Sequence, residues 1–245
     1  VLFRSNHATG TLTFLTGALS ASNGNGLTFN NADGIYNFNG VTTLNGGAAG
    51  INIENGSSGN FSFLNAPITN PSGVAFRVNG GGGSIGHVGA ITKSSAGQVV
   101  DSQGRTGGSV TFNSSVTANT SASGILVQSC SGGTVTFLGP SASLNTGVNP
   151  AVNLASNTGA TINFSGGGLN LTTTTGTGFN ATGGGTVSVQ GAANIISAGN
   201  GTALNVASTA IGASGLTFQS ISSSGGSNNG IILDTTGASG GLTVT

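Results

Sequence analysis

Apolar and polar residues alternate in short stretches that recur along the whole chain. In the clearest copy, Val135 and Phe137 alternate with Thr134 and Thr136, which is typical of a strand with one buried and one solvent-facing side. The apolar residue that ends this stretch has a counterpart every 24 to 29 residues. This expected core ladder consists of Phe14, Phe38, Phe63, Val88, Phe112, Phe137, Phe164, Val189, Phe218 and Val244. A repeat of this length that lacks helical segments indicates a solenoid.

Each repeat contains two further short apolar stretches. In the sixth repeat they are residues 143–145 (SLN) and 151–154 (AVNL). Clusters of Gly, Asn and Ser separate the stretches, and these residues tolerate the positive φ of tight turns. Three strands and three turns in about 25 residues predict an all-β, right-handed parallel β-helix of about ten rungs. Sandwiches and barrels do not repeat one apolar pair at this interval, and a disordered chain has no core that would keep apolar residues in register.

Stacked rungs place equivalent residues above one another at about 4.8 Å. The fourth repeat, residues 84–88 (SIGHV), fits the pattern least well. With Val88 in the core ladder, Gly86 falls where other repeats have a second large inward residue. A slip of one residue would instead place Ile85 there and turn His87 inward. The gaps of 25 and 24 residues around Val88 favour the first register.

The regular repeat predicts one β-helix domain over residues 6–245. Val1–Ser5 (VLFRS) fit no repeat, and we expect them to be a non-native leader. The last stretch, residues 241–245 (GLTVT), keeps the apolar pattern without a charge or a proline. We therefore expect an internal part of a longer array, whose unpaired strand edges favour end-to-end self-association of the isolated chain.

Charge and cysteine content narrow the function classes. Four Lys plus Arg balance four Asp plus Glu, so no basic field exists to attract nucleic acid or anionic lipid. No apolar run approaches the roughly 18 residues of a membrane span. Cys130 is the only cysteine, and the bases His7 and His87 lie in other repeats, which argues against a thiol nucleophile. We expect no catalytic residue, no cofactor and no metal site, because four acidic residues are too few for calcium-binding repeats.

The best candidate for chemistry is a surface patch of Glu54, Arg77 and Asp101. Each follows an inward apolar residue of a third strand, so we expect one outward column in repeats two to four. One interpretation is a structural ion ladder. The other interpretation is a sugar-active site that resembles the one in pectate-lyase-like β-helices, in which acidic residues bind calcium and a basic residue abstracts a sugar proton. Calcium takes six to eight oxygens, and two carboxylates separated by an arginine supply too few.

Hydroxyl and amide residues form further columns. The position before each core-ladder residue predicts an outward column of Thr13, Asn37, Ser62, His87, Thr111, Thr136, Asn163, Ser188, Thr217 and Thr243. This column resembles the ice-binding face of some solenoid antifreeze proteins, although Thr is also an ordinary residue of exposed strands. An asparagine after the second strand, present as Asn45, Asn70, Asn119 and Asn145, predicts a stacked amide ladder.

The C-terminal fifth of the chain contains the most specific sequence motifs. It contains residues 201–206 (GTALNV), 211–222 (IGASGLTFQSIS), 229–233 (NGIIL) and 240–245 (GGLTVT). This run resembles the repeats of large bacterial β-strand-repeat surface or secreted proteins, which are similar to adhesins and autotransporter passengers. The resemblance implies a non-catalytic structural or adhesive stalk outside the bacterial cell, with flanking repeats and host or matrix glycans or proteins as partners. The alternatives are a carbohydrate-binding or pectate-lyase-like β-helix and, second, an ice-binding face.

Overall fold

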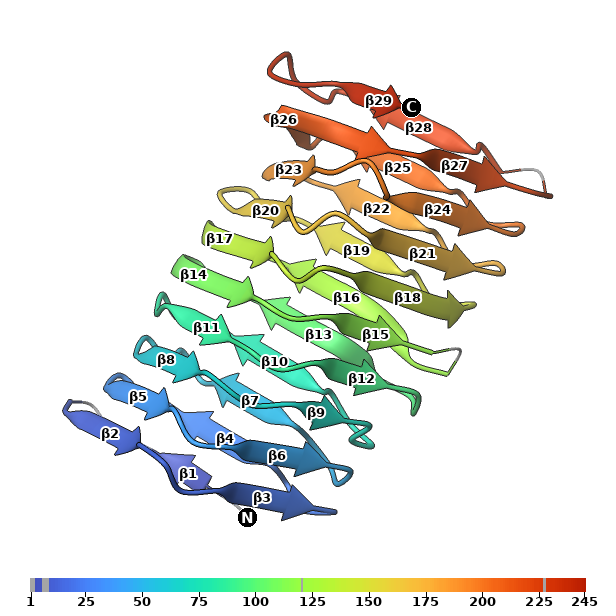
Figure 1. The fold of residues 1–245 in the computed structure, drawn as a ribbon. Coiled ribbons are helices and arrows are strands. Elements are labelled where there is room, and N and C mark those ends of the chain that lie inside the picture. Colours follow the sequence, from blue (N-terminus) through green and yellow to red (C-terminus); the bar gives the residue numbers. More distant parts are fainter. Residues whose placement is uncertain (1–2, 6–8, 120, 227) are drawn as a thin grey trace.

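The computed structural model describes residues 3–5, 9–119, 121–226 and 228–245, with side chains from residue 9 onward. Val1, Leu2 and His7 lie outside the described residues. Within the described part the chain is all-β, and its 29 strands form three parallel sheets. The chain visits the sheets in turn, so each strand pairs with the strand three elements further along (Figure 1). This arrangement confirms the parallel β-helix with three strands per rung, in about nine full turns.

Neighbouring strands of each sheet pair in parallel from one end of the described chain to the other. Sheet A contains β1 (Phe3–Ser5), β4 (Leu27–Asn30), β7 (Ile51–Glu54), β10 (Phe76–Asn79), β13 (Gln98–Gln103), β16 (Ser123–Gln128), β19 (Val152–Ala155), β22 (Phe179–Thr182), β25 (Leu204–Ala207) and β28 (Ile231–Asp234). Sheet B contains β2 (Thr11–Phe14), β5 (Ile35–Phe38), β8 (Asn60–Phe63), β11 (Ile85–His87), β14 (Thr106–Phe112), β17 (Gly132–Phe137), β20 (Thr161–Phe164), β23 (Thr186–Val189), β26 (Ala210–Phe218) and β29 (Leu242–Val244). Sheet C contains β3 (Leu19–Ser22), β6 (Thr42–Asn45), β9 (Ile68–Thr69), β12 (Ile91–Lys93), β15 (Val116–Ala118), β18 (Ala142–Gly147), β21 (Leu169–Thr173), β24 (Ile195–Ala198) and β27 (Ser220–Ser223).

The corner from sheet A to sheet B has the same backbone conformation after each sheet A strand from β4 onward. The residue that follows the strand has a positive φ, between 50° and 79°. These residues are Asn31, Asn55, Gly80, Gly104, Ser129, Ser156, Gly183, Ser208 and Thr235. The left-handed conformation is cheap for Gly and Asn and tolerated by Ser. This explains why small polar residues separate the apolar stretches.

The core is lined by apolar residues of all three sheets and includes a column of stacked rings along sheet B. Phe137 lies between Phe112 and Phe164, with ring centroids 5.0 and 4.8 Å apart and interplanar angles of 9° and 6°. Phe38 and Phe63 stack in the same way nearer the N-terminus, at 5.0 Å. Such offset stacking adds to the free energy gained by burying each ring. The outermost members of the ladder are less covered: Phe14 is partly buried and Val244 is 51% exposed.

The fourth rung departs from the expected ladder. Strand β11 pairs His87 with Phe63 and with Phe112, and Ile85 with Phe61 and Val110. The prediction that Val88 occupies the ladder is therefore wrong, and so is the outward position assigned to His87, which is taken by Gly86. The reason is that Ile85 fills the second inward column better than Gly86 would. His87 is then 1% exposed within the core.

The ninth rung contains a second correction. Val187 pairs with Ile211 and Val189 pairs with Leu216, with a register shift between them. The repeat predicted instead that Val187 would be level with Leu216 and Val189 with Phe218. The long gap before Phe218 holds a bulge in β26, which accommodates extra residues without losing the sheet. Phe218 is still fully buried and is level with Val244.

The N-terminal residues also differ from expectation. Phe3–Ser5 form β1 and pair with Leu27, Thr28 and Phe29 of β4. The inference that the first five residues fit no rung is therefore wrong for Phe3–Ser5, whose backbone continues sheet A. That residues 1–5 are a non-native leader stays a prediction.

Candidate functional site

The outer face of sheet A carries the ion pair of the candidate patch, and its register differs from the prediction. Arg77 is level with Asp101 and with Asn52. Glu54 lies two residues further along its strand, level with Asn30. The expected single column of Glu54, Arg77 and Asp101 is therefore wrong. Both Ile51 and Ile53 face inward, so the alternating pattern alone allows either of them to align with Phe76, and the structure selects Ile51.

Arg77 and Asp101 form an ion pair that is part of a hydrogen-bonded chain. The Arg77 Nη2 and Nε atoms each lie 3.1 Å from Asp101 Oδ2. Gln103 Nε2 donates to Asp101 Oδ1 at 2.6 Å, and Gln128 Nε2 donates to Gln103 Oε1 at 2.7 Å. The Asp101 side chain is only 2% exposed, whereas that of Arg77 is 41% exposed. Both carboxylate oxygens of Asp101 are thus already engaged as acceptors.

Further along the same face, three asparagines form an amide ladder. Asn180 Nδ2 donates to Asn153 Oδ1, and Asn205 Nδ2 donates to Asn180 Oδ1, both at 2.8 Å. The ladder expected after the second strand is not continuous, because Asn45 is level with Thr69 and not with Asn70. A stacked amide ladder therefore exists, but on sheet A.

A groove runs along the start of sheet A across β4, β7 and β10, which lie side by side in blue to cyan (Figure 1). It consists of two adjoining hollows of about 360 and 270 Å³ that share Ala48, Ala49 and Asn52. We call it the sheet A groove. Its further lining residues are Asn25, Thr28, Asn30, Glu54, Gly73, Val74 and Arg77. Two of the three predicted patch residues, Glu54 and Arg77, therefore line one groove although they are in different columns.

The turns that form the wall of this groove are held by backbone hydrogen bonds between rungs. Ala48 N donates to Gly24 O at 3.0 Å, and Gly73 N donates to Ala48 O at 2.9 Å. A Cβ atom at Gly73 would lie 2.3 Å from Ala48 O, so only glycine permits this close stacking. Sequence analysis missed this wall, because two alanines and a glycine in a turn carry no chemical signal.

The fourth rung buries three basic side chains, those of His87, Lys93 and Arg105. The sequence pattern predicted that His87 would face outward and did not single out the other two. Lys93 is level with Ala118 inside the core and is 1% exposed. Its Nζ atom donates to Pro71 O at 2.6 Å, Gly73 O at 2.5 Å and Ser95 Oγ at 2.8 Å. Burial lowers the Lys93 pKa to about 8, so the ammonium persists at neutral pH. Lys93 therefore ties the corner after sheet C to the previous rung.

Arg105 likewise connects neighbouring rungs, at the corner between sheets A and B. It is 2% exposed, and its Nη1 atom donates to Gly80 O at 3.1 Å. Its Nη2 atom donates to Gly107 O at 3.0 Å and also to Gly83 O. Burial lowers the Arg105 pKa. The partners are backbone oxygens, which explains why the sequence gives no hint of them.

Cys130 lies one rung above Arg105 at this corner and is fully buried. Its thiol donates to Gln128 O at 3.4 Å, and its backbone N–H donates to Asn157 Oδ1 at 3.2 Å. Burial raises the Cys130 pKa, against a smaller lowering by Arg105. These surroundings favour the protonated thiol as a small core residue. Among the described residues, no three His, Cys, Asp or Glu side chains lie together as metal ligands would.

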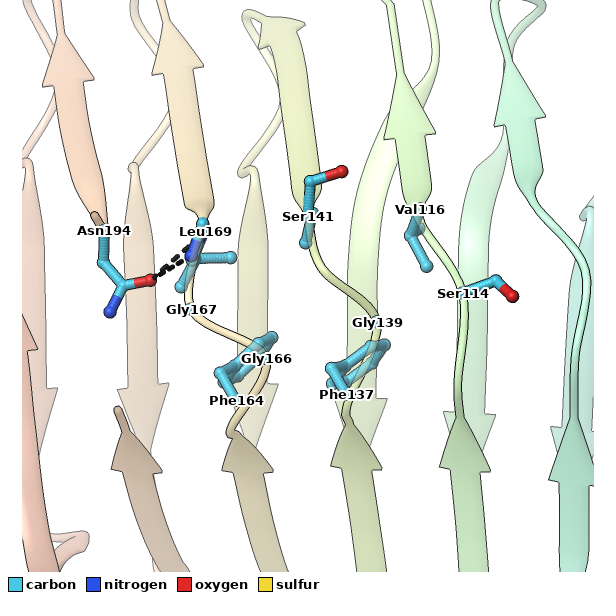
Figure 2. A pocket seen from close by; sticks show the side chains of 12 residues that line it. Ser114, Val116, Phe137, Gly139, Ser141, Phe164, Gly166, Gly167, Leu169 and Asn194 are labelled. Carbon is cyan, nitrogen blue, oxygen red and sulfur yellow. Dashed lines mark hydrogen bonds between the residues drawn. The ribbon is translucent and has the colours of Figure 1, made fainter. Parts of the chain in front are cut away.

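A small cavity lies at the corner between sheets B and C, beside Phe137, Phe164 and Leu169 (Figure 2). Its volume is about 10 Å³, which is the space of a single water molecule. Asn194 closes it: Oδ1 accepts from the Gly168 and Leu169 N–H groups, and Nδ2 donates to the Gln190, Gly191 and Thr217 carbonyls. The amide is saturated by backbone groups, so this cavity is a structural feature of the corner.

The outer face of sheet B carries the hydroxyl columns. Thr134, Thr161 and Thr186 are level with one another, and so are Thr136, Asn163 and Ser188. Gly86 interrupts the second column in the fourth rung, and Ser188 is only 5% exposed near the bulge of β26. The regular part of this array is therefore limited to a few rungs.

Comparison of this chain with protein-family models, with curated proteins and with solved structures finds no match. In the described part of the chain, no helix is long and apolar enough to cross a membrane.

Proposed function

We propose that this chain is a non-catalytic structural and adhesive segment of a bacterial extracellular or cell-surface repeat protein. The observation that carries the proposal is how the ionisable groups of the described core are used. His87, Lys93, Arg105 and Cys130 are buried, and each is hydrogen-bonded to backbone carbonyl groups. The outer faces instead carry hydroxyl and amide columns in register. Such a molecule extends one rung at a time and presents a long polar surface.

The stacking of the rungs supports partnership with flanking repeats, because each sheet grows by pairing a strand in parallel with the equivalent strand of the next rung. Flanking repeats and host or matrix glycans or proteins are the partners that the proposal implies.

Removing one whole rung tests the modular architecture that a stalk requires. Thr134 and Thr161 are level in neighbouring strands, so deletion of residues 134–160 rejoins sheet B in register. We expect this variant to keep a β-type circular dichroism spectrum and cooperative unfolding, because each rung contacts only its neighbours. Deletion of residues 134–147 serves as the control and should unfold, because it removes β18 and most of β17 and leaves β16 and β19 of sheet A without the sheet B and sheet C segments that connect them. Equal damage by both deletions would contradict the proposal.

A polysaccharide assay tests the alternative of a pectate-lyase-like enzyme. We expect no release of unsaturated or reducing sugars from pectin-like polysaccharides, with or without calcium. Asp101 is engaged by Arg77 and Gln103, and an arginine guanidinium is a poor base. Release of unsaturated products that is lost in Arg77→Ala and kept in Asp33→Asn would contradict this expectation and support the enzyme.

A further inference from the structure

We propose that the sheet A groove binds an uncharged oligosaccharide that lies along the axis of the β-helix. The inference rests on the proposed adhesive function and adds the place and the class of its ligand. The groove crosses three successive sheet A strands, β4, β7 and β10. Its floor therefore spans about 10 Å at the usual strand spacing, which is room for about two linked sugar rings.

The groups on the floor suit sugar hydroxyls. Thr28, Asn52 and Arg77 are level in neighbouring strands and place a hydroxyl, an amide and a guanidinium in one row. Glu54 and Asn30 add a carboxylate and an amide in the next row. Neighbouring donors and acceptors of this kind can bind vicinal hydroxyl groups in pairs. A few convergent polar groups in a concave site are the usual pattern of small-ligand recognition.

The floor and the wall are both held in place before any ligand binds. Asn52 Nδ2 donates to Glu54 Oε2 at 2.9 Å and orients that carboxylate. Asp101 holds Arg77 through its Nε and Nη2 atoms. The wall of Ala48, Ala49, Gly73 and Val74 is fixed by the hydrogen bonds between rungs described above. Preorganised groups lose little conformational freedom on binding, which favours a ligand even in a shallow groove.

The charges around the groove select against acidic ligands. Glu54 lines the groove, and Arg77 is already paired with Asp101, so two carboxylates accompany one guanidinium. The local charge is therefore negative, and an acidic polysaccharide would meet repulsion that an uncharged one does not. The apolar residues that line the groove, Ala48, Ala49 and Val74, are small and include no aromatic ring or long aliphatic side chain.

The test is an NMR titration of the full chain with neutral hexasaccharides of glucose, mannose and galactose, beside oligogalacturonate as the acidic probe. We expect at least one neutral probe to shift amide resonances of residues in and around 48–54 and 73–77, and oligogalacturonate to bind more weakly. Ala48→Phe should weaken binding at least tenfold because it fills the groove from an exposed position. Glu54→Gln should weaken it several-fold through loss of a charge-assisted acceptor.

Two matched variants control for bulk and for charge. Ala192→Phe adds the same ring at an exposed alanine of another corner, and Asp33→Asn removes an exposed carboxylate outside the groove. Both should bind like the parent. Absence of binding by every neutral probe, stronger binding of oligogalacturonate, or undiminished binding in Ala48→Phe would overturn the inference. Failure here combined with a folded whole-rung deletion would leave the structural role standing, so the two proposals fail separately.

Discussion

Replacing Phe137 by aspartate should unfold several rungs of the β-helix. Phe137 is 4% exposed and is stacked between Phe112 and Phe164. Loss of a buried phenylalanine ring costs about 3–5 kcal/mol, and an unpaired carboxylate in its place adds several kcal/mol more. The sum is comparable with the roughly 5–15 kcal/mol of free energy that stabilises a typical domain. We expect loss of cooperative thermal unfolding and rapid amide hydrogen exchange in β14, β17 and β20.

Thr136→Asp is the matched control, because Thr136 is the neighbour of Phe137 on the same strand and faces outward. It introduces the same charge into the same strand with little loss of packing, and surface substitutions of this kind usually change stability by less than about 0.5 kcal/mol. Phe137→Leu should lie between the two variants. If Phe137→Asp melted at the temperature of Thr136→Asp, the buried ring column could not be the main support of the fold.

Acidification should weaken the fold through His87, and His87→Phe should remove much of that effect. Burial lowers the His87 pKa from 6.5 to about 4, although a hydrogen bond to Ala66 O opposes the shift. The rings of Phe63, Phe76 and Phe112 surround the imidazole, and no ion pair reaches it among the described residues. The Nε2 atom lies 2.8 Å from Ala66 O and can donate to it, whereas Nδ1 is buried without a partner.

The direction follows from proton binding. Between pH 6.5 and about 4 the unfolded chain binds a proton at His87 that the folded chain does not. The His87 contribution to the free energy of unfolding is therefore complete above the unfolded pKa and is lost as the pH falls through this window. The loss is about 3 kcal/mol at most, at 1.36 kcal/mol per pKa unit. Urea unfolding at several pH values would measure it.

In His87→Phe, a ring at this position would join the stacks on either side and raise the free energy of unfolding at every pH. The free energy of unfolding should then fall less steeply with decreasing pH in this window than it does in the parent. A variant with the same slope between pH 6.5 and about 4 as the parent would show that His87 is not the titrating group.

The polar side chains on the outer faces differ from one part of the β-helix to another. The third and fourth rungs combine buried basic groups with the ion pair of Arg77 and Asp101, whereas later rungs carry the amide ladder from Asn153 to Asn205. The sheet A groove lies in the early rungs, beside the charged patch. A binding role and a structural role can therefore occupy separate lengths of one uniform scaffold.

The sequence by itself determined the length of one rung and which of its residues face inward. A residue such as Phe137 has counterparts at a nearly constant interval, and alternation around it fixes which side of the strand is buried. These two regularities were enough to predict three parallel sheets and the ring column, because stacking like on like requires no information beyond the repeat. The turn residues followed too, since a left-handed corner favours residues such as Asn55 and Gly104.

Only the tertiary structure decided how individual rungs align. Alternation states which residues face inward but not which inward residue of one strand lies above which of the next, so Glu54 and the pair Val88 and His87 were misplaced by local spacing. Lys93 and Arg105 point inward despite their charge because carbonyl oxygens of neighbouring rungs accept hydrogen bonds from them. Every residue has the same backbone carbonyl group, so the sequence does not show which carbonyl oxygens will accept these hydrogen bonds. Their arrangement around a buried charge exists only once the rungs have stacked.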